Sequence, residues 1–182
     1  TDNDNVSIYD TFTIIVTNSL PANPGNGAIP TIAAGSEHTV VLQSDGRVWA
    51  WGNNSYGQLG NGTTRSNSTP VKVSGLFDVI SIAVGSQHTA ALKSDGTVWT
   101  WGRNWEGQLG DGTTTDRSTP IRVSNLFNVT AIAAGYEHTM ALKGNNEIWA
   151  WGRNWEGQLG DGTTTSSSMP VQVSGMSGTI AT

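Results

Sequence analysis

The chain has 182 residues, a formal net charge of −5 and no cysteine, which excludes disulfides and thiolate chemistry. Nucleic-acid-binding proteins gather Lys and Arg into patches, but here nine basic residues are scattered among fourteen acidic ones, so no nucleic-acid partner is expected. No apolar run approaches the roughly 20 residues that span a bilayer, and membrane insertion is not expected either. The 23 glycines favour short strands and tight turns over long helices.

Residues 1–19 are predicted to form a β-strand segment separate from the remainder of the chain. Apolar and polar residues alternate along it, which places Phe12, Ile14 and Val16 on one face. The segment resembles the last strand of cadherin-like or immunoglobulin-like surface modules. It is interpreted either as a remnant of a preceding β-sandwich module or as a donor strand that completes a sheet in a neighbouring subunit. Residues 20–27, rich in Pro, Gly and Asn, are predicted to be a linker.

Residues 28–182 contain three consecutive repeats, at about 28–77, 78–127 and 128–177, followed by the start of a further strand. The same residue types return every 50 residues without insertion or deletion, as Gly35, Gly85 and Gly135 illustrate. A fixed period of this kind predicts that each repeat forms one supersecondary unit that packs against its neighbours.

Each repeat is predicted to supply four short strands. In the first repeat these are an apolar run at Ile32–Ala34, a second strand at Thr39–Gln43, a third at Arg47–Trp51 and an outer strand at Pro70–Val73. The Asp-Gly pair at the corner between the second and third strands is a strong hairpin signal. A proline is expected at the start or edge of a strand, which favours the outermost position for the fourth.

The third strand of each repeat is apolar on both faces, because its tryptophans alternate with Val, Ile, Ala or Thr. Such a sheet must be covered on both sides, and radially stacked blades achieve this. Blade packing is therefore the predicted role of the six strand tryptophans: Trp49, Trp51, Trp99, Trp101, Trp149 and Trp151.

These motifs resemble a known family. The run Ile-Ala-Ala-Gly-Ser-Glu-His-Thr, then Val-Trp-Ala-Trp-Gly, then Tyr56–Gly60 is similar to the regulator of chromosome condensation repeat, over about residues 28 to 178. The last motif returns with Trp105 and Trp155 in place of Tyr56. The resemblance implies an all-β fold: a partial β-propeller of three four-stranded blades, an incomplete ring, with an extra N-terminal strand.

Three blades cannot close a ring, since propellers have about four to eight. The chain is interpreted as a fragment of a longer array, as a protomer of a ring built from several chains, or as a subunit of an open polymer. The leading hypothesis is a non-catalytic structural or adhesive module of an extracellular or cell-surface prokaryotic protein. It would self-assemble through open blade edges and the N-terminal strand. The alternative is a protein-binding domain that forms part of a longer, closed propeller. The expected partner is therefore the chain itself or another protein, with no cofactor.

The three histidines recur once per repeat, each followed by Thr, and a structural hydrogen bond in every blade is predicted for His38, His88 and His138. Equivalent positions on successive blades lie a whole blade apart, whereas metal ligands converge within about 2 Å of one ion, so no metal site is predicted. Ser36, Ser86 and Tyr136 stand where the plant ultraviolet photoreceptors of the family that this chain resembles carry tryptophan, which argues against light sensing.

The Gly-rich loops supply the interaction candidates. Trp105 and Trp155 are interpreted either as exposed anchors for a partner or as cover for the neighbouring blade, and Tyr56, Glu106 and Glu156 occur in the same loops. The recurrence of the two glutamates favours loop structure over catalysis. Asn-x-Ser/Thr triplets would be glycosylation acceptors in an exported chain, and they begin at Asn5, Asn53, Asn61, Asn67 and Asn128.

Overall fold

The computed structural model describes residues 28–176. The predicted N-terminal strand with Phe12, Ile14 and Val16, the linker, Asn5 and the further strand expected after the third repeat lie outside the described residues. Within residues 28–176 every regular element is a β-strand, and no helix there could cross a membrane.

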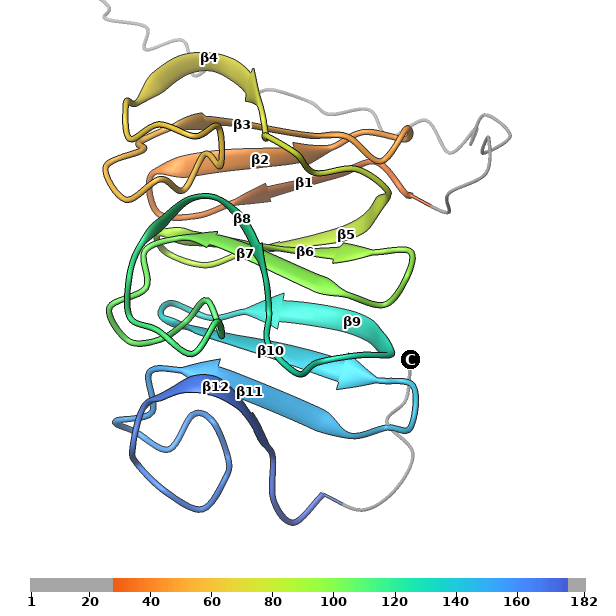
Figure 1. The fold of residues 1–182 in the computed structure, drawn as a ribbon, viewed down its shortest axis with the longest axis vertical. Coiled ribbons are helices and arrows are strands. Elements are labelled where there is room, and N and C mark those ends of the chain that lie inside the picture. The colour runs from red at the N-terminus through yellow and green to blue at the C-terminus, as the bar shows by residue number, and fades with distance from the viewer. Residues whose placement is uncertain (1–27, 177–182) are drawn as a thin grey trace, which may run out of the picture.

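Twelve strands form three antiparallel four-stranded sheets, one per repeat, as predicted (Figure 1). In each sheet the strands are hydrogen-bonded in chain order. Blade 1 comprises β1 (Thr31–Ala34), β2 (His38–Leu42), β3 (Val48–Gly52) and β4 (Asn67–Lys72). Blade 2 comprises β5 (Val79–Val84), β6 (His88–Lys93), β7 (Val98–Gly102) and β8 (Arg117–Arg122). Blade 3 comprises β9 (Val129–Ala134), β10 (His138–Lys143), β11 (Ile148–Gly152) and β12 (Ser167–Gln172).

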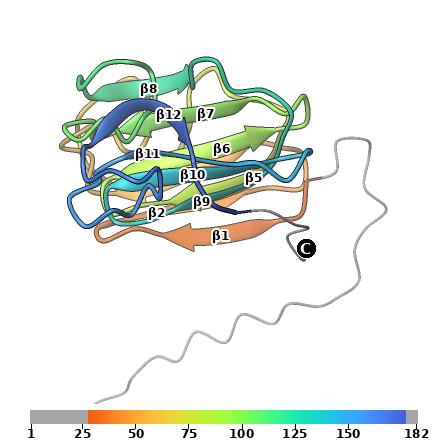
Figure 2. The same ribbon diagram turned by 90° about the horizontal axis from the view of Figure 1, so that it is seen from below.

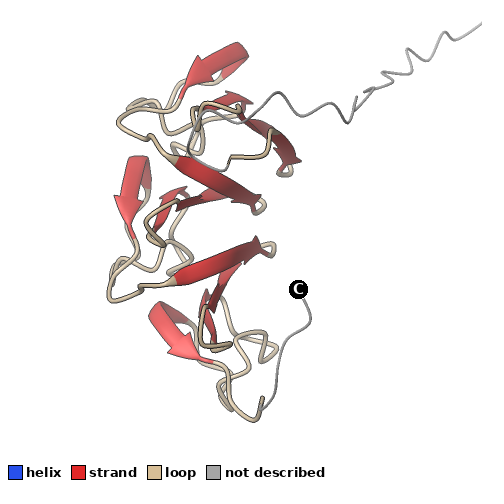
Figure 3. Cartoon of the chain, turned by 90° about the vertical axis from the view of Figure 1, so that its right-hand side faces the viewer, coloured by secondary structure: helices blue, strands red, loops and turns tan. Residues whose placement is uncertain are grey.

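The blades stack in one row that does not close (Figure 3). The first strands, β1, β5 and β9, lie along one side of the row, while β8 and β12 lie along the opposite side (Figure 2). The arrangement confirms the predicted partial propeller. One face of blade 1 and one face of blade 3 are therefore left at the two ends of the row.

The predicted corner between the second and third strands is confirmed. In blade 1, β2 and β3 pair from His38 opposite Gly52 to Leu42 opposite Val48, and Gly46 in the turn has a φ of 76°. In blade 3 the corresponding residue is Asn146, with a φ of 65°. Asn tolerates this left-handed conformation better than most residues, so the turn survives the loss of glycine.

The outer strand begins earlier than predicted. β4 starts at Asn67, so Pro70 lies inside the strand and does not lead it. The pairing of β3 with β4 shifts register between Ala50 and Gly52, which marks a bulge or irregularity there. A bulge interrupts the ladder, and β4 is an edge strand that needs donors on one side only, so a proline is tolerated inside it.

The hydrophobic core lies between the sheets. Val40, Leu42, Val48 and Ala50 of blade 1 pack in one cluster with residues of blade 2, among them Trp101. A second cluster joins blades 2 and 3 through a set that includes Leu92, Val98, Leu126, Val129, Ala141 and Trp151. Each inner sheet face is thereby covered by its neighbour, as the double-sided apolar pattern requires.

Candidate interaction surfaces

The Gly-rich loop that follows the third strand of each blade is built around one buried asparagine. In blade 2, Asn104 Nδ2 donates to the backbone oxygens of Thr113 (3.0 Å) and Thr115 (3.1 Å) and to Asp111 Oδ1 (3.2 Å). Its Oδ1 accepts from the backbone N–H of Leu109 at 2.9 Å. Asn54 and Asn154 make the same bonds in the other blades. One side chain thus closes a loop of more than ten residues.

We expect Asn104→Asp to lower the free energy of unfolding by about 3 kcal/mol, because buried groups left without partners each cost about 1–3 kcal/mol. The substitution keeps the shape but turns the amide donor into an oxygen that faces two carbonyls and a carboxylate. Urea unfolding measures the change, with the exposed Asn145→Asp as control. Equal effects of the two substitutions would contradict the anchoring role.

The loops of blades 1 and 2 also dock on the next blade. The carbonyl of Gln58 accepts from Trp101 Nε1 at 2.9 Å and from Thr89 Oγ1 at 3.3 Å, both in blade 2. Gly60 lies against the same indole, because a Cβ added there would come within 2.7 Å of Trp101 Nε1. The N–H of Gly62 donates to the carbonyl of Ser118 at 2.9 Å. Loop and strand tryptophan therefore form one joint between neighbouring blades.

Two of the three histidines belong to such joints, so the hydrogen bond predicted in every blade is found at His38 and His88. His38 Nε2 lies 3.0 Å from Thr89 Oγ1 of the next blade, and His88 Nε2 lies 3.0 Å from Thr139 Oγ1. Each threonine hydroxyl donates onward to a loop carbonyl, so it accepts from the histidine and fixes the Nε2–H tautomer. Burial lowers the pKa of His38 to about 4 and the pKa of His88 to about 3. Both rings are therefore neutral links between blades. Among residues 28–176 no three potential metal-ligating side chains cluster.

The two loop tryptophans remain largely exposed, although Trp105 also contacts the preceding blade. Trp105 is 56% exposed and Trp155 is 60% exposed. Trp105 meets Tyr56 of blade 1 edge-to-face, with ring centroids 5.6 Å apart. The Arg103 guanidinium lies 4.4 Å from the Trp105 centroid, and that of Arg153 lies 4.3 Å from the Trp155 centroid. Each indole is thus held against a cation but leaves more than half its surface free.

A single buried carboxylate ties the two arginines together. Arg103 Nη1 lies 2.6 Å from one oxygen of Glu137, and Arg153 Nη1 lies 3.2 Å from the other. Arg103 also donates to Gln87 at 3.1 Å. The sequence pattern did not indicate this cluster, because Asn53 replaces the arginine in blade 1 and Gln87 replaces the glutamate in blade 2. The chain of contacts runs from Tyr56 through Trp105, Arg103, Glu137 and Arg153 to Trp155, and we call Tyr56, Trp105 and Trp155 the aromatic row.

The other sequence candidates fall into separate local roles. Glu106 Oε2 accepts from Ser166 Oγ of the next blade at 3.0 Å, while the equivalent Glu156 is exposed. Asn53 and Asn61 accept hydrogen bonds inside their own loop. Asn67 begins β4, and Asn128 occupies a turn with a φ of 57°. Glycosylation at these asparagines stays a prediction.

Family comparison agrees with this architecture. A model of the RCC1-like domain matches residues 8–182. The chain belongs to this family. Human WBSCR16, a solved structure, is similar over 81% of the chain, with a TM-score of 0.72 and 26% identity. Prp20p from Saccharomyces cerevisiae is similar in fold over 80%, with a TM-score of 0.72 and 23% identity. The RCC1-like chain covers 38% of each of those two chains.

Curated RCC1-like relatives match over single repeats. The human E3 ubiquitin-protein ligase HERC2 is 47% identical over 45 residues, which is 25% of this chain and 1% of that protein. The ultraviolet-B receptor UVR8 of Arabidopsis thaliana is 42% identical over 48 residues, 26% of this chain and 11% of the receptor. The chain therefore spans a small part of the curated relatives it matches, and their activities do not transfer with the repeat.

Proposed function

We propose that this RCC1-like chain is a non-catalytic protein-binding module whose partner contacts the aromatic row. The observation that carries the proposal is the pair of exposed indoles, Trp105 and Trp155, each stacked on an arginine that shares Glu137. Tryptophan is enriched among residues that dominate binding energy at protein interfaces.

The contacts that hold the aromatic row in place support a role in protein binding. A side chain that is ordered before binding loses less entropy when a partner arrives, so pre-organised anchors bind more tightly than free ones. Arg103 and Arg153 are themselves fixed by ion pairs to one buried carboxylate. The indoles consequently present rigid apolar faces next to polar loop groups, a combination typical of interface centres.

Related propellers supply a precedent for protein recognition on this fold. Yeast Prp20p has been studied for its binding properties to Gsp1p and histones, and it has also been solved with Kap60 bound. Those partners are properties of the yeast protein. For the present chain they support the general class of partner, a protein, and not its identity.

The experiment is selection of peptides from a displayed random library against the purified chain, followed by affinity measurements on substituted chains. We expect Trp105→Ala and Trp155→Ala each to weaken the selected peptides at least about tenfold, as loss of an interface anchor does. Phe127→Ala is the matched control, because Phe127 is 54% exposed and stacked on Arg122 at 5.0 Å. Peptides that bind all three variants equally well would contradict the proposal.

A second candidate function is structural: self-association of the chain as a building unit. It is favoured by the open ends of the row, where Ile29 is 65% exposed and Ile32 is 58% exposed. Exposed apolar patches of this kind often mark association sites. An adhesive role in an extracellular or cell-surface protein, and a contribution of Phe12, Ile14 and Val16 to assembly, belong to this second proposal.

A further inference from the structure

The two joints inside the chain use the same positions, and they define what one blade requires of the next. They differ at the indole, because Trp101 Nε1 donates to the Gln58 carbonyl whereas Trp151 Nε1 has no hydrogen-bond partner in the described part of the chain. The following blade contributes four apolar positions. In the first joint they are Val79, Ile82, Ala91 and Trp101 of blade 2, and in the second they are the equivalent Val129, Ile132, Ala141 and Trp151 of blade 3. The preceding blade contributes the facing set. In the first joint this set is Val40, Leu42 and Val48 of blade 1, and in the second joint it is Ala90, Leu92 and Val98 of blade 2. All six of these facing residues are at most 1% exposed.

The open face of blade 1 carries the following-blade half of this joint. Counting back 50 residues from blade 2 gives Ile29, Ile32, Val41 and Trp51, which we call the N-terminal face. Val79 and Ile82 are 0% and 8% exposed, whereas Ile29 and Ile32 are 65% and 58% exposed. Trp51 is half-buried, while Trp101 and Trp151 are fully buried. The N-terminal face therefore has the residues of a joint, but no neighbouring blade among the described residues buries them.

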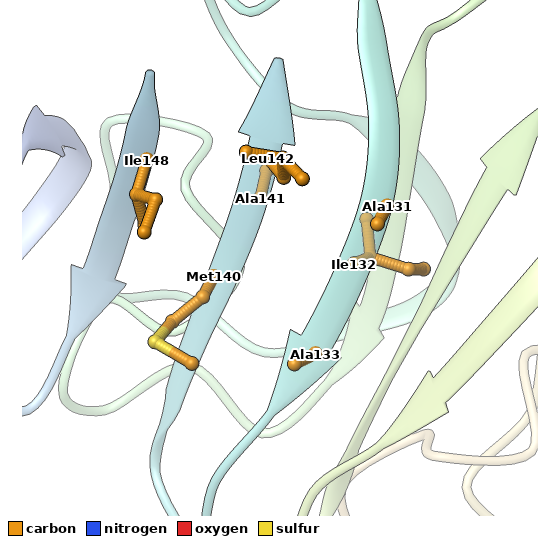
Figure 4. Close-up of a pocket in the computed structure, with 7 residues that line it drawn as sticks. All are labelled: Ala131, Ile132, Ala133, Met140, Ala141, Leu142 and Ile148. Carbon is orange, nitrogen blue, oxygen red and sulfur yellow. The ribbon is translucent and has the colours of Figure 1, made fainter. Parts of the chain in front are cut away.

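The open face of blade 3 carries the preceding-blade half. Met140, Leu142 and Ile148, with Ala131 and Ala133, line an apolar hollow on β9, β10 and β11, which we call the C-terminal face (Figure 4). Met140, Leu142 and Ile148 correspond to Val40, Leu42 and Val48. They are half-buried, and their counterparts are at most 1% exposed. The hollow lies at the position where blades 1 and 2 pack against the following blade, and like those positions it is apolar.

The polar groups of the joint are divided between the same two faces. Blade 3 has His138, whose counterparts reach a threonine of the following blade, and blade 1 has Thr39, the counterpart of those threonines. Blade 3 also has Gly160, exposed here although Gly60 and Gly110 each lie against the indole of a following blade. Trp51 is the matching indole on blade 1. The two ends therefore hold between them the donor, acceptor, glycine and indole positions of one joint.

We propose that the C-terminal face of one chain docks on the N-terminal face of a second copy, reproducing the joint found between consecutive blades. A second copy is the occupant because it carries both halves position for position, with an apolar residue at every apolar position of the joint, although Ile29, Val41, Met140 and Ile148 differ in size from their counterparts. The contact is heterologous, so repetition gives a closed ring or an open filament according to the rotation per chain. This inference rests on the self-association proposed above, and it leaves the aromatic row as a separate surface.

Cysteine pairs test the geometry, and the chain has no cysteine of its own. Inside the chain Ser36 Oγ and Ser86 Oγ lie 3.0 Å apart, with Ser36 N–H donating to the Ser86 carbonyl and Ser86 N–H to the Tyr136 carbonyl. Ser36→Cys/Ser86→Cys should close within one chain and serves as the positive control. Ser36→Cys/Tyr136→Cys should instead give a ladder of disulfide-linked multimers of the 19.2 kDa chain. Multimers absent while the control closes would overturn the proposal.

Blocked faces test the direction of docking. Ile32→Asp disables the N-terminal face and Met140→Asp the C-terminal face, so each variant alone is expected to be monomeric. An equimolar mixture should form a dimer of one of each and nothing larger, because only one compatible pair of faces remains. Association of either variant by itself would overturn the head-to-tail contact but leave self-association standing. A monomeric unsubstituted chain would overturn both, while peptide binding to the aromatic row would be unaffected.

Discussion

Replacing Gly85 by alanine should lower the free energy of unfolding by about 3 kcal/mol, the upper part of the range for overpacking a filled core. Gly85 directly follows β5, at the point where blade 2 meets blade 3. An added Cβ would overlap the His88 ring and come within 2.7 Å of the Gly135 carbonyl oxygen. The ring cannot move aside without losing its bond to Thr139, and the carbonyl belongs to the backbone of the next blade.

Gly144→Ala is the matched control for this prediction. Neither Gly85 nor Gly144 has a positive φ, so an added Cβ meets no left-handed backbone at either position. Gly85 is buried and Gly144 is exposed. The nearest atom to a Cβ at Gly144 is 3.7 Å away, an ordinary contact. Urea unfolding at neutral pH compares the two variants. If Gly85→Ala were no less stable than Gly144→Ala, the close packing of glycine, histidine and neighbouring carbonyl would be contradicted.

Acidification should destabilise the blades before their carboxylates titrate. His38 and His88 have folded-state pKa values of about 4 and about 3, below the ordinary value of 6.5. Above pH 6.5 both histidines are neutral in the folded and in the unfolded chain, so the free energy of unfolding does not change with their protonation. As the pH falls below 6.5, these histidines bind protons in the unfolded chain but stay neutral in the folded chain. The free energy of unfolding therefore falls until the pH reaches the folded-state pKa. For His38 alone the loss reaches about 3 kcal/mol, since one pKa unit corresponds to about 1.4 kcal/mol.

Two measurements check this expectation. The urea midpoint of the unsubstituted chain should drop steadily between about pH 6.5 and pH 4.5, the window below the ordinary histidine pKa. His38→Gln should show a smaller drop over the same range, because one proton-linked group has been removed. Proton NMR of the folded chain should show no titration of His88 in that window, and His38 should begin to titrate only at its acidic end. A histidine that titrates near 6.5 in the folded state would contradict the buried, neutral links between blades.

The repeat, the four strands per blade and the unclosed row could all be predicted from sequence, because periodic apolar positions and the Asp45-Gly46 turn depend on local chemistry. Other features depend on contacts distant in sequence. Glu137 meets Arg103 across 34 residues, and nothing in either local pattern indicates that pair. Asn104 did recur at the repeat spacing, and its constant place two residues after the Trp-Gly pair was the signal that could have revealed the loop anchor.

The strand tryptophans show where a correct general prediction lacked detail. Trp99 and Trp101 were assigned one packing role, yet Trp101 is fully buried against the preceding loop and Trp99 is half-buried. Trp99 donates from Nε1 to Thr97 at 3.2 Å and lies 5.9 Å from the Lys93 ammonium group. Trp99 and Trp101 are two residues apart and therefore lie on the same face of the strand. The difference in depth comes from the blade 1 loop that covers Trp101, a contact that the strand pattern does not indicate.

The most direct measurement of whether the two open faces are halves of one joint is the mass of the unsubstituted chain in solution at increasing concentration. Sedimentation equilibrium should show masses that rise from 19.2 kDa to multiples of that value. The same rise should disappear with Ile32→Asp. A mass that stays at one chain across the whole concentration range would contradict the complementary faces.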